Sequence, residues 1–571
     1  MKNSPPGSKT WKLKPKSPLV PQLVAEAKVT PLQAQLLANR GLTDTSAIQS
    51  FLSPRLSQMI DPMRMKGMDE AVKSIVLAIE EHDKITVYGD YDADGLTATA
   101  LLATFLSHLG LSVATYVPDR LKEGYGLNEA AMKHIQENGT GLIITVDCGI
   151  SNDREVTLAK RLGMDVVVTD HHLVPSGFRP QCPVINPHQP GCSFPFKGLS
   201  GVGLAFFLAV GLRTALRKKG WFKSRSEPDL RDYLDLVALG TMADRVPLLG
   251  QNRILVSGGV TRMANSIWPG IRAIMTVAGV GMTDVSSDDL AFRVAPRLNA
   301  PGRMGDSGLG LQILMTEKQA EAHVLANKID ATNVRRRTLE QEILEQATAM
   351  IDDRMEGGRT LLLSSENWHT GVLGIVASRL VERYHKPVMI AAIRDGIAVG
   401  SGRSIDGFDL YSAMKKMSHC FLRFGGHSHA AGFTLKTSEL EALRKGLEME
   451  AEAHLQPKDL IPTIRVDSEL SFRNITLDVI HQINALAPFG EGNPEPVFMA
   501  RSVKVFESRV VGERHLKLRL GQGEQVLDAI AFGLGNRHPL KGISTDFLFT
   551  PEVNRWQGTE TVQLKIIDLA R

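Results

Sequence analysis

A strand, an acidic loop and the first turn of a helix follow one another in Ile85-Thr-Val-Tyr-Gly-Asp-Tyr-Asp-Ala-Asp-Gly-Leu96. The first four residues are β-branched or aromatic, which predicts a short strand, and a helical pattern occupies residues 96–109. Three carboxylates, Asp90, Asp92 and Asp94, stand between the two elements. Carboxylates held this close together are costly unless cations compensate them, and hard oxygen ligands suit Mg²⁺ or Mn²⁺. The stretch therefore predicts a metal-binding loop at the end of a strand.

The same D-x-D-x-D-G opening begins calcium loops of the EF-hand type. Those loops need a Glu at their twelfth position and a helix in front. Counted from Asp90, the twelfth residue is Leu101, and the preceding residues 85–88 predict a strand. Both requirements fail, so the calcium-loop interpretation is rejected.

Strand and helix patterns continue to alternate after this loop. Residues 142–146 and 166–169 predict strands, and residues 153–162 predict a helix between them. This βαβα order predicts a parallel sheet covered by helices, with ligand sites at the carboxyl ends of the strands. A second α/β pattern begins near Arg359, with a strand over 360–363 and a helix over 372–384.

The chain as a whole predicts an α/β protein of several parts, since one core seldom serves more than roughly 300 residues. We expect the following segments: a basic disordered tail at 1–20, a catalytic domain at 21–317, a linker helix at 318–356, a smaller α/β domain at 357–456 and a β-barrel at 457–571. Alternation in residues 515–520, where Leu516, Leu518 and Leu520 share one face, supports the barrel. The linker carries Arg335-Arg336-Arg337, interpreted as part of a solvated helix, with contact to phosphates left open.

Composition indicates a soluble globular protein, with 43% hydrophobic and 22% charged residues. A net charge of +4 is too small to indicate a nucleic-acid ligand by itself. The longest apolar run, residues 201–212, is shorter than the roughly 20 residues that cross a bilayer, and the N-terminus shows no signal sequence. Secretion and membrane association are therefore not expected.

The four cysteines, Cys148, Cys182, Cys192 and Cys420, are too few and too dispersed for a disulfide scaffold, which predicts free thiols and a cytoplasmic protein. Cys182, His188 and Cys192 lack a CxxC pair and a fourth ligand nearby, so a zinc site is not expected there.

Polar side chains follow three further predicted elements. Asp147 follows the strand at 142–146, Asp170-His171-His172 follows the run 165–169, and Asp244 follows an apolar helical pattern at 234–243. Each of these residues alone is better interpreted as a helix cap or a satisfied core histidine. Together they supply about enough nitrogen and oxygen ligands for two adjacent ions.

The triplet Asp170-His171-His172 is the signature of the DHH phosphoesterases, and the order of the acidic sites resembles the four motifs of that family. Additional segments resemble its branch of single-strand-specific 5′ exonucleases: Arg40-Gly41, Phe51-Leu52, Val146-Asp-Cys-Gly-Ile150 and Ala238-Leu-Gly-Thr-Met-Ala-Asp244. The resemblance covers nearly the whole chain beyond the tail. It implies a hydrolase that degrades single-stranded DNA from 5′ to 3′ into mononucleotides, in DNA recombination and repair, with two Mn²⁺ or Mg²⁺ ions.

The resemblance also implies roles for individual residues of the acidic motifs. It implies Asp147 as the bridge between two ions, and His172 as a ligand or as a group beside the scissile phosphate. The implied metal ligands are Asp90, Asp92, Asp94, Asp147, His171 and Asp244. The implied catalytic set is Asp92, Asp94, Asp147, His171, His172 and Asp244.

Two glycine-rich turns of the smaller α/β domain resemble the DHH-associated domain: Ser401-Gly-Arg-Ser404 and Gly425-Gly-His-Ser-His-Ala-Ala-Gly432. Glycines leave backbone N–H groups exposed to an anion, and the run His369-Thr-Gly-Val-Leu-Gly374 resembles a helix start that faces the substrate. Ser401 and Arg403 are implied to recognise a terminal 5′ phosphate, with Arg297 or Arg303 as partner. The predicted substrate-binding residues are Arg297, Asn299, Arg303, His369, Ser401, Arg403, Gly426 and His427.

The C-terminal segment resembles an OB-fold introduced by Ala487-Pro-Phe-Gly-Glu-Gly-Asn-Pro494. OB-folds bind single strands through basic grooves and stacked rings, which makes Phe506, His515, Lys517 and Arg519 candidates. The family implies single-stranded DNA as ligand, with single-strand-binding protein and a helicase as partners. Two alternatives remain: a phosphodiesterase of short RNA or cyclic dinucleotides, and a catalytically inactive nucleic-acid-binding scaffold.

Overall fold

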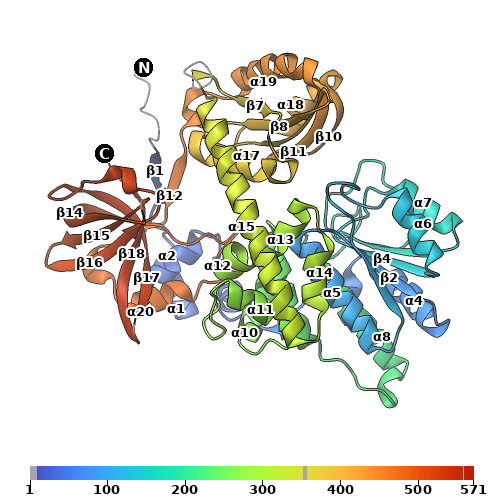
Figure 1. Cartoon of the computed structure of the whole chain (residues 1–571). Helices are drawn as coiled ribbons and strands as arrows, with labels where there is room; N and C mark the ends of the chain where they lie inside the picture. The colour runs from blue at the N-terminus through green and yellow to red at the C-terminus, as the bar shows by residue number, and fades with distance from the viewer. Residues whose placement is uncertain (1–8, 352–356, 513, 557, 571) are drawn as a thin grey trace. The chain divides into compact units, whose positions relative to one another are not determined.

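The structure is a computed structural model that describes residues 9–351, 357–512, 514–556 and 558–570 (Figure 1). The chain divides into two compact units. The first unit comprises residues 12–302, 307–327 and 465–571, and the second comprises residues 1–11, 303–306 and 328–464. The predicted metal ligands all lie in the first unit.

The first unit contains a parallel sheet with strand order β3-β2-β4-β5-β6. Its central strands are β2 (Ile85–Gly89), β4 (Leu142–Val146) and β5 (Asp165–Thr169), and its edges are β3 (Val113–Tyr116) and β6 (Val184–Ile185). Every residue of β2 and β4 is buried, as expected for a parallel sheet with both faces covered. The predicted fold class is confirmed.

Helices cover both faces of this sheet. α5 (Ala93–His108) and α8 (Gly201–Lys218) pack against its central strands (Figure 1). α6 (Glu129–Glu137) and α7 (Asp153–Arg161) share a separate core with Ile143, Val166 and Val168. The fold continues through α9 (Leu234–Ala243), α10 (Gly250–Met263), α11 (Pro269–Val277), α13 (Ala295–Met304) and α14 (Gly308–Met315).

The C-terminal strands of the first unit form a closed barrel in the order β14-β15-β16-β18-β17, and pairing of β14 with β17 completes the closure. The strands are β14 (Phe498–Val511), β15 (His515–Gln522), β16 (Gln525–Ala531), β17 (Ser544–Trp556) and β18 (Thr559–Leu569). Leu516, Leu518 and Leu520 are buried in the barrel core, which confirms the predicted alternation.

Three N-terminal helices pack on the barrel: α1 (Val20–Ala27), α2 (Pro31–Ala38) and α3 (Thr45–Leu52). Leu23, Leu36 and Ile48 from these helices share one apolar core with Phe498 and Phe549 of the barrel. The helices that we expected in the catalytic domain thus share their core with the barrel, although more than 400 residues separate Leu36 from Phe498 in sequence.

The predicted basic tail needs a correction within the residues that the structure describes. Thr10–Leu13 forms strand β1, which pairs with β12 (Thr463–Val466), and α1 already begins at Val20. Lys14 Nζ lies 2.9 Å from Asp467 Oδ1. Backbone pairing and this ion pair explain why the segment is ordered. Residues 1–8 lie outside the described part of the chain.

The second unit contains a mixed sheet with strand order β10-β11-β9-β8-β7. Its strands are β7 (Leu361–Ser365), β8 (Val388–Arg394), β9 (Ile397–Arg403), β10 (Phe421–His427) and β11 (Ala430–Lys436). α17 (Leu373–Tyr384) packs on β8 and β9, and α18 (Leu410–Lys416) and α19 (Leu440–His454) complete the unit.

The predicted linker is the 31-residue helix α15 (Gln319–Ala349). The expectation of a fully solvated helix is wrong at Arg336, which is 8% exposed. Arg336 Nη1 donates to Glu340 Oε2 at 2.8 Å, and Arg336 Nη2 donates to Asn333 Oδ1 at 2.7 Å. These three residues recur at helical spacing and form a buried polar face, whereas Arg335 and Arg337 are exposed. Residues 352–356 lie outside the described part of the chain.

None of the described helices combines the length and the apolar character needed to span a bilayer.

Candidate active site

Acidic residues meet at one edge of the parallel sheet. Asp90 follows β2, Asp147 follows β4, and Asp170 follows β5. Since the carboxyl ends of parallel strands point to the same edge, the topology brings together three segments that are distant in sequence. Asp90, Asp147 and Asp170 are 5%, 2% and 0% exposed.

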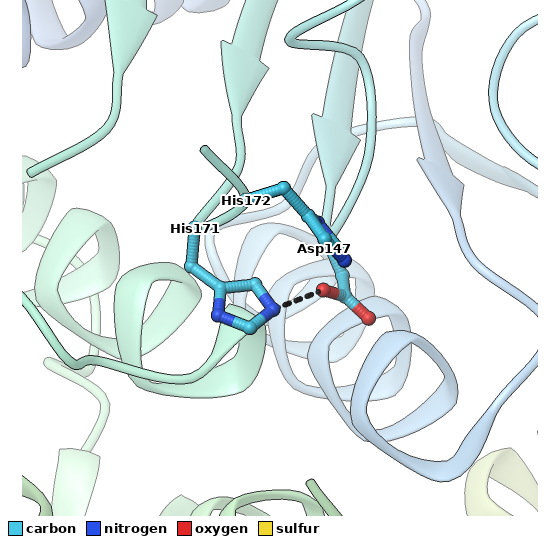
Figure 2. A group of neighbouring side chains, drawn as sticks. All are labelled: Asp147, His171 and His172. Atoms are coloured by element: carbon cyan, nitrogen blue, oxygen red, sulfur yellow. Dashed lines mark ion pairs between the residues drawn. The ribbon is translucent and has the colours of Figure 1, made fainter. Parts of the chain in front are cut away.

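All of the predicted metal ligands converge at this edge. They fall into three groups whose potential ligand atoms lie within 4.8 Å of one another: Asp147, His171 and His172; Asp94, His171 and Asp244; and Asp90, Asp92 and Asp147. His171 Nε2 lies 3.1 Å from Asp147 Oδ1 (Figure 2) and 3.6 Å from Asp244 Oδ2. Because Asp147 and His171 each belong to two groups, they connect the cluster.

The backbone is adapted to bring Asp147 into the cluster. Its φ of 62° is left-handed, which is uncommon for a residue other than glycine. A Cβ atom at Gly201 would stand 2.6 Å from the Asp147 Cβ, so only glycine at this position lets α8 approach so closely. The side-chain hydroxyl of Thr145 donates to the Cys148 carbonyl at 2.7 Å and fixes the turn.

Two helix N-termini face the carboxylates. Asp92 caps α5, because its Oδ1 accepts hydrogen bonds from the Asp94 and Gly95 amides at 3.0 and 3.1 Å. Asp94 in turn accepts from the Gly201 and Val202 amides of α8 at 2.6 and 2.9 Å. The positive ends of both helices stabilise these carboxylates.

Asp170 orients His172 and is not itself in any of the three ligand groups. Its Oδ1 accepts from the His172 amide at 3.0 Å and lies 2.7 Å from His172 Nδ1, while Oδ2 accepts from the Ile150 amide at 2.9 Å. Burial opposes ionisation of Asp170, but the His172 side chain and these donors outweigh it and lower its pKa. Burial also opposes protonation of His172, but the Asp170 hydrogen bond outweighs it and raises the pKa of His172 to about 9.

Tyr125 is a neighbour of the cluster that sequence reasoning did not single out. Its hydroxyl lies 3.0 Å from His172 Nδ1 and donates to the Asp147 carbonyl at 3.2 Å. No periodicity or motif singles out a lone tyrosine in a loop, so its place beside the cluster follows only from the folded structure.

The negative charge of the clustered carboxylates is not balanced by the protein alone. Burial, with the neighbouring carboxylates, raises the pKa of Asp90 and of Asp147 well above the ordinary value, and burial with Asp244 raises the pKa of Asp94 to about 7. Within the described residues, Asp90 Oδ1, Asp147 Oδ1 and Asp244 Oδ2 are buried without a hydrogen-bond partner. Oxygen donors with one or two imidazoles suit Mn²⁺ or Mg²⁺. The residues present therefore fit the predicted metal centre.

The second unit carries the predicted anion-binding residues on one sheet face. Ser401 and Arg403 are two residues apart on β9, so their side chains share a face. Arg403 is opposite Ala430 of β11, and Ala430 is opposite His427 of β10. A Cβ atom at Gly425 or Gly432 would have no neighbour within 4 Å. The face thus presents Ser401, Arg403 and His427 around two open glycines.

The start of α17 lies against the same residues. A Cβ atom at Gly374 would stand 2.9 Å from Arg403 Nη2 and 3.6 Å from Ser401 Oγ. His369 Nδ1 accepts from the Gly371 amide at 3.1 Å, just before the helix begins. Arg303 Nη1 donates to the Gly371 carbonyl at 3.5 Å. A helix N-terminus and two arginines therefore converge in this unit.

Three other predicted substrate residues have backbone roles in the structure. Gly426 has a φ of 144°, and a Cβ atom there would stand 2.3 Å from the Ala430 carbonyl oxygen. Arg297 belongs to the first unit and donates to the Arg293 carbonyl at 2.6 Å. Asn299 Oδ1 accepts from the Ala93 amide at 2.8 Å, so Asn299 supports the start of α5 beside the metal loop.

Family models match three segments of the chain: the DHH family N-terminal domain at residues 84–241, the DHHA1 domain at 357–453 and the RecJ OB domain at 466–568. The chain is 37% identical over 561 residues to the single-stranded-DNA-specific exonuclease RecJ of Escherichia coli (strain K12), covering 95% of this chain and 96% of that protein. The chain belongs to the RecJ family. The RecJ of Bacillus subtilis (strain 168) is 36% identical, covering 98% of this chain and 70% of that protein.

Solved RecJ structures agree with this assignment. A crystal structure of RecJ in complex with Mn²⁺ from Thermus thermophilus superimposes with a TM-score of 0.84 at 31% identity, over 98% of this chain and 79% of that one. A crystal structure of the same organism's RecJ with Mg²⁺ gives a TM-score of 0.77 at 30% identity, over 98% of this chain and 78% of that one. The RecJ fold predicted from the motifs is confirmed.

Proposed function

We propose that the chain is a metal-dependent exonuclease that hydrolyses single-stranded DNA from the 5′ end to mononucleotides, in DNA recombination and repair. The observation that carries the proposal is the convergence of carboxylates and imidazoles, in which Asp90 Oδ1, Asp147 Oδ1 and Asp244 Oδ2 are buried without a hydrogen-bond partner within the described residues. The curated relatives are named as single-stranded-DNA-specific exonucleases. Neither alternative function, on short RNA and cyclic dinucleotides or as an inactive scaffold, is favoured by these relatives.

In this proposal the residues that would hold the ions are Asp90, Asp92, Asp94, Asp147, His171 and Asp244, and Asp147, which belongs to two of the ligand groups, would be the shared ligand. Mn²⁺ or Mg²⁺ ions held there would activate a water and stabilise the leaving oxygen. The cluster's oxygen-rich donor set supports this choice of ions.

His172 is proposed to contact the scissile phosphate. Asp170 Oδ1 lies 2.7 Å from its Nδ1, so Nε2 is the ring nitrogen outside that hydrogen bond, and the side chain is 46% exposed. In the metal-free chain the Asp170 hydrogen bond outweighs burial and raises the pKa of His172 to about 9, which favours the protonated imidazole. A protonated imidazole donates to a phosphate oxygen and stabilises the added negative charge of the transition state.

The second unit is proposed to hold the 5′ phosphate. Ser401, Arg403 and His427 surround open glycines, and the α17 N-terminus adds backbone donors. A terminal phosphate carries more negative charge than an internal one, so such a site favours the chain end. Between the two arginines that sequence left open, the proximity of Arg303 to Gly371 supports Arg303.

The barrel is proposed to bind the single strand beyond the cleavage site. His515, Lys517 and Arg519 alternate with the buried leucines of β15 and therefore face outward, and Phe506 is 39% exposed. On the family resemblance we further propose single-strand-binding protein and a helicase as partners. The four free cysteines support a cytoplasmic location.

The direct test is incubation with end-labelled oligonucleotides in Mn²⁺ and in chelator. We expect 5′-phosphorylated single strands to yield labelled mononucleotides, blunt duplex to resist, and Asp244→Ala to abolish the activity. Equal degradation of both substrates would refute the specificity, and activity in chelator would refute the metal mechanism. Release of label from the 3′ end first would refute the polarity.

A further inference from the structure

Asp244 reaches the cluster from the end of a helix rather than from a strand. It is the C-cap of α9, with extended backbone angles of φ −89° and ψ 155°, and its amide donates to the Gly240 carbonyl at 3.1 Å. Its Oδ1 accepts from the Arg245 amide at 2.8 Å. A helix C-terminus carries partial negative charge, which disfavours a carboxylate there. The position of Asp244 therefore depends on the segment that follows it, residues 245–249.

Residues 245–249 pack on the loop that introduces the barrel, residues 487–494, here called the entry loop. The Leu248 amide donates to the Glu491 carbonyl at 2.8 Å. A Cβ atom at Gly492 would stand 3.2 Å from Pro247 Cβ and 3.3 Å from Leu249 Cδ1. The two segments are thus closely packed, and a side chain at Gly492 would have to displace Pro247 and Leu249 by a few tenths of an ångström.

The entry loop is itself held rigidly. The buried Asn493 side chain donates to the Leu486 and Pro488 carbonyls, both at 2.8 Å. Arg40 Nε donates to Asn493 Oδ1 at 2.7 Å, and Arg40 Nη2 donates to the Pro494 carbonyl at 2.6 Å. These hydrogen bonds restrain the loop near both of its ends, at Pro488 and at Pro494.

A second arginine ties the entry loop to α10, the helix that begins where residues 245–249 end. Arg253 is 2% exposed, and its Nη2 donates to the Ala487 carbonyl at 2.7 Å. The same side chain donates from Nε to the Phe51 carbonyl at 2.7 Å. The segment that carries Asp244 is therefore tethered to the entry loop both directly and through the next helix.

We propose that the entry loop is a positioning element for the metal centre, with Gly492 and Asn493 as positioning residues for Asp244. The inference rests on the proposed metal-dependent function. Through this loop the barrel and the metal ligand share one packed network, so a change in the loop shifts Asp244 without altering any ligand. If the loop served only to attach the barrel, its disturbance would change stability and leave metal affinity unaltered.

Gly492→Leu and Gly523→Leu form a matched pair that separates these two roles. Both glycines have left-handed backbone angles, with φ of 73° and 60°, so a leucine strains the backbone similarly at either position. A Cβ atom at Gly523, in the turn between β15 and β16, would meet no atom within 4 Å. Only the substitution at Gly492 pushes against Pro247 and Leu249.

The measurement is Mn²⁺ titration of the full-length chain without DNA, with free Mn²⁺ followed by electron paramagnetic resonance. Residues that orient metal ligands typically change metal affinity by roughly 10–100-fold when mutated, so Gly492→Leu is expected to weaken Mn²⁺ binding by about that factor. Gly523→Leu is expected to bind Mn²⁺ like the parent. Parental affinity in Gly492→Leu, or equal weakening in both variants, would overturn the inference.

Two further measurements keep the test decisive. If Gly492→Leu does not fold, the pair Gly492→Ala and Gly523→Ala is titrated, and the same difference is expected at smaller size; equal affinities would again overturn the inference. Because binding is measured without DNA, the proposed function fails separately: a parent chain that binds Mn²⁺ but degrades no DNA would refute the nuclease and leave the positioning role standing.

Discussion

Replacing Asp94 by Asn removes a negative charge from the centre of the acidic cluster. Asp94 is 2% exposed, and burial with the nearby Asp244 raises its pKa from 3.8 to about 7. The folded chain therefore holds the Asp94 proton more tightly than the unfolded chain does. The stability that this proton contributes is present below about pH 4 and is lost as the pH rises to about 7.

The expected magnitude follows from this shift and from the hydrogen bonds of Asp94. A shift of roughly 3 pKa units corresponds to about 4 kcal/mol of unfavourable ionisation at pH 8. Asn accepts with one oxygen only, so one of the two amides, Gly201 or Val202, loses its partner at a cost of about 1–3 kcal/mol. We expect Asp94→Asn to be more stable than the metal-free parent by about 1–3 kcal/mol at pH 8, and by close to nothing at pH 5.

The assay is urea unfolding in chelator at pH 5 and pH 8, repeated at pH 8 with Mn²⁺. Saturating Mn²⁺ at about 100 times its dissociation constant should stabilise the parent by roughly 2.7 kcal/mol, and should stabilise the variant much less. A variant less stable than the metal-free parent at pH 8 would refute the argument that the charge of Asp94 destabilises the metal-free chain. A difference independent of pH would refute it equally.

Three further substitutions test other parts of the structure. Burial raises the pKa of Asp235 to about 6, although the hydrogen bond from Ser266 lowers it, so the stability of the parent falls between about pH 4 and pH 6. Asp235→Asn should therefore be more stable than the parent by about 1–2 kcal/mol in thermal unfolding at pH 8 and equally stable at pH 4. A gain in stability at pH 4 would contradict this. Arg403→Lys keeps the charge but loses the planar fork, so KM for 5′-phosphorylated single strands should rise about tenfold while that for 5′-hydroxyl strands changes little. An unchanged preference for the 5′ phosphate would place its recognition elsewhere. Arg253→Met leaves the Phe51 and Ala487 carbonyls without a donor and should cost about 2–5 kcal/mol in urea unfolding, whereas a loss below about 1 kcal/mol would show that water replaces the arginine.

The metal cluster was predictable because topology and chemistry point to the same place. Asp147 and His171 follow apolar runs that had to be neighbouring parallel strands, and such strands bring their carboxyl ends to one edge. The roles of the individual residues at that edge were not predictable. Asp170 and His171 are adjacent in sequence, yet only the second lies among the potential ligands, because alternate residues of a turn point in different directions.

Other features were hidden because they depend on contacts remote in sequence. Arg297 and Arg303 lie on one helix, α13, and helical spacing alone does not say which end meets a partner. The N-terminal helices carry ordinary amphipathic patterns that give no sign of a core shared with the barrel. Burial of Arg336 could have been suspected, since Asn333 and Glu340 stand at its own helical spacing, but a run of three arginines resembles a solvated face.

Three local costs meet at the metal centre: the left-handed backbone of Asp147, the raised pKa values of the carboxylates, and the position of Asp244 at the negative end of α9. Such unfavourable features persist only where the surrounding structure holds them in place. Here the buried strands, two helix N-termini and the entry loop do so. Two kinds of substitution should then lower metal affinity alike but change metal-free stability in opposite directions. Asp94→Asn removes a ligand and relieves repulsion, so metal affinity falls while metal-free stability rises. Gly492→Leu keeps every ligand and all of the repulsion, so metal affinity falls and metal-free stability falls as well. If both variants changed metal-free stability in the same direction, repulsion among the carboxylates would not be what destabilises the metal-free chain.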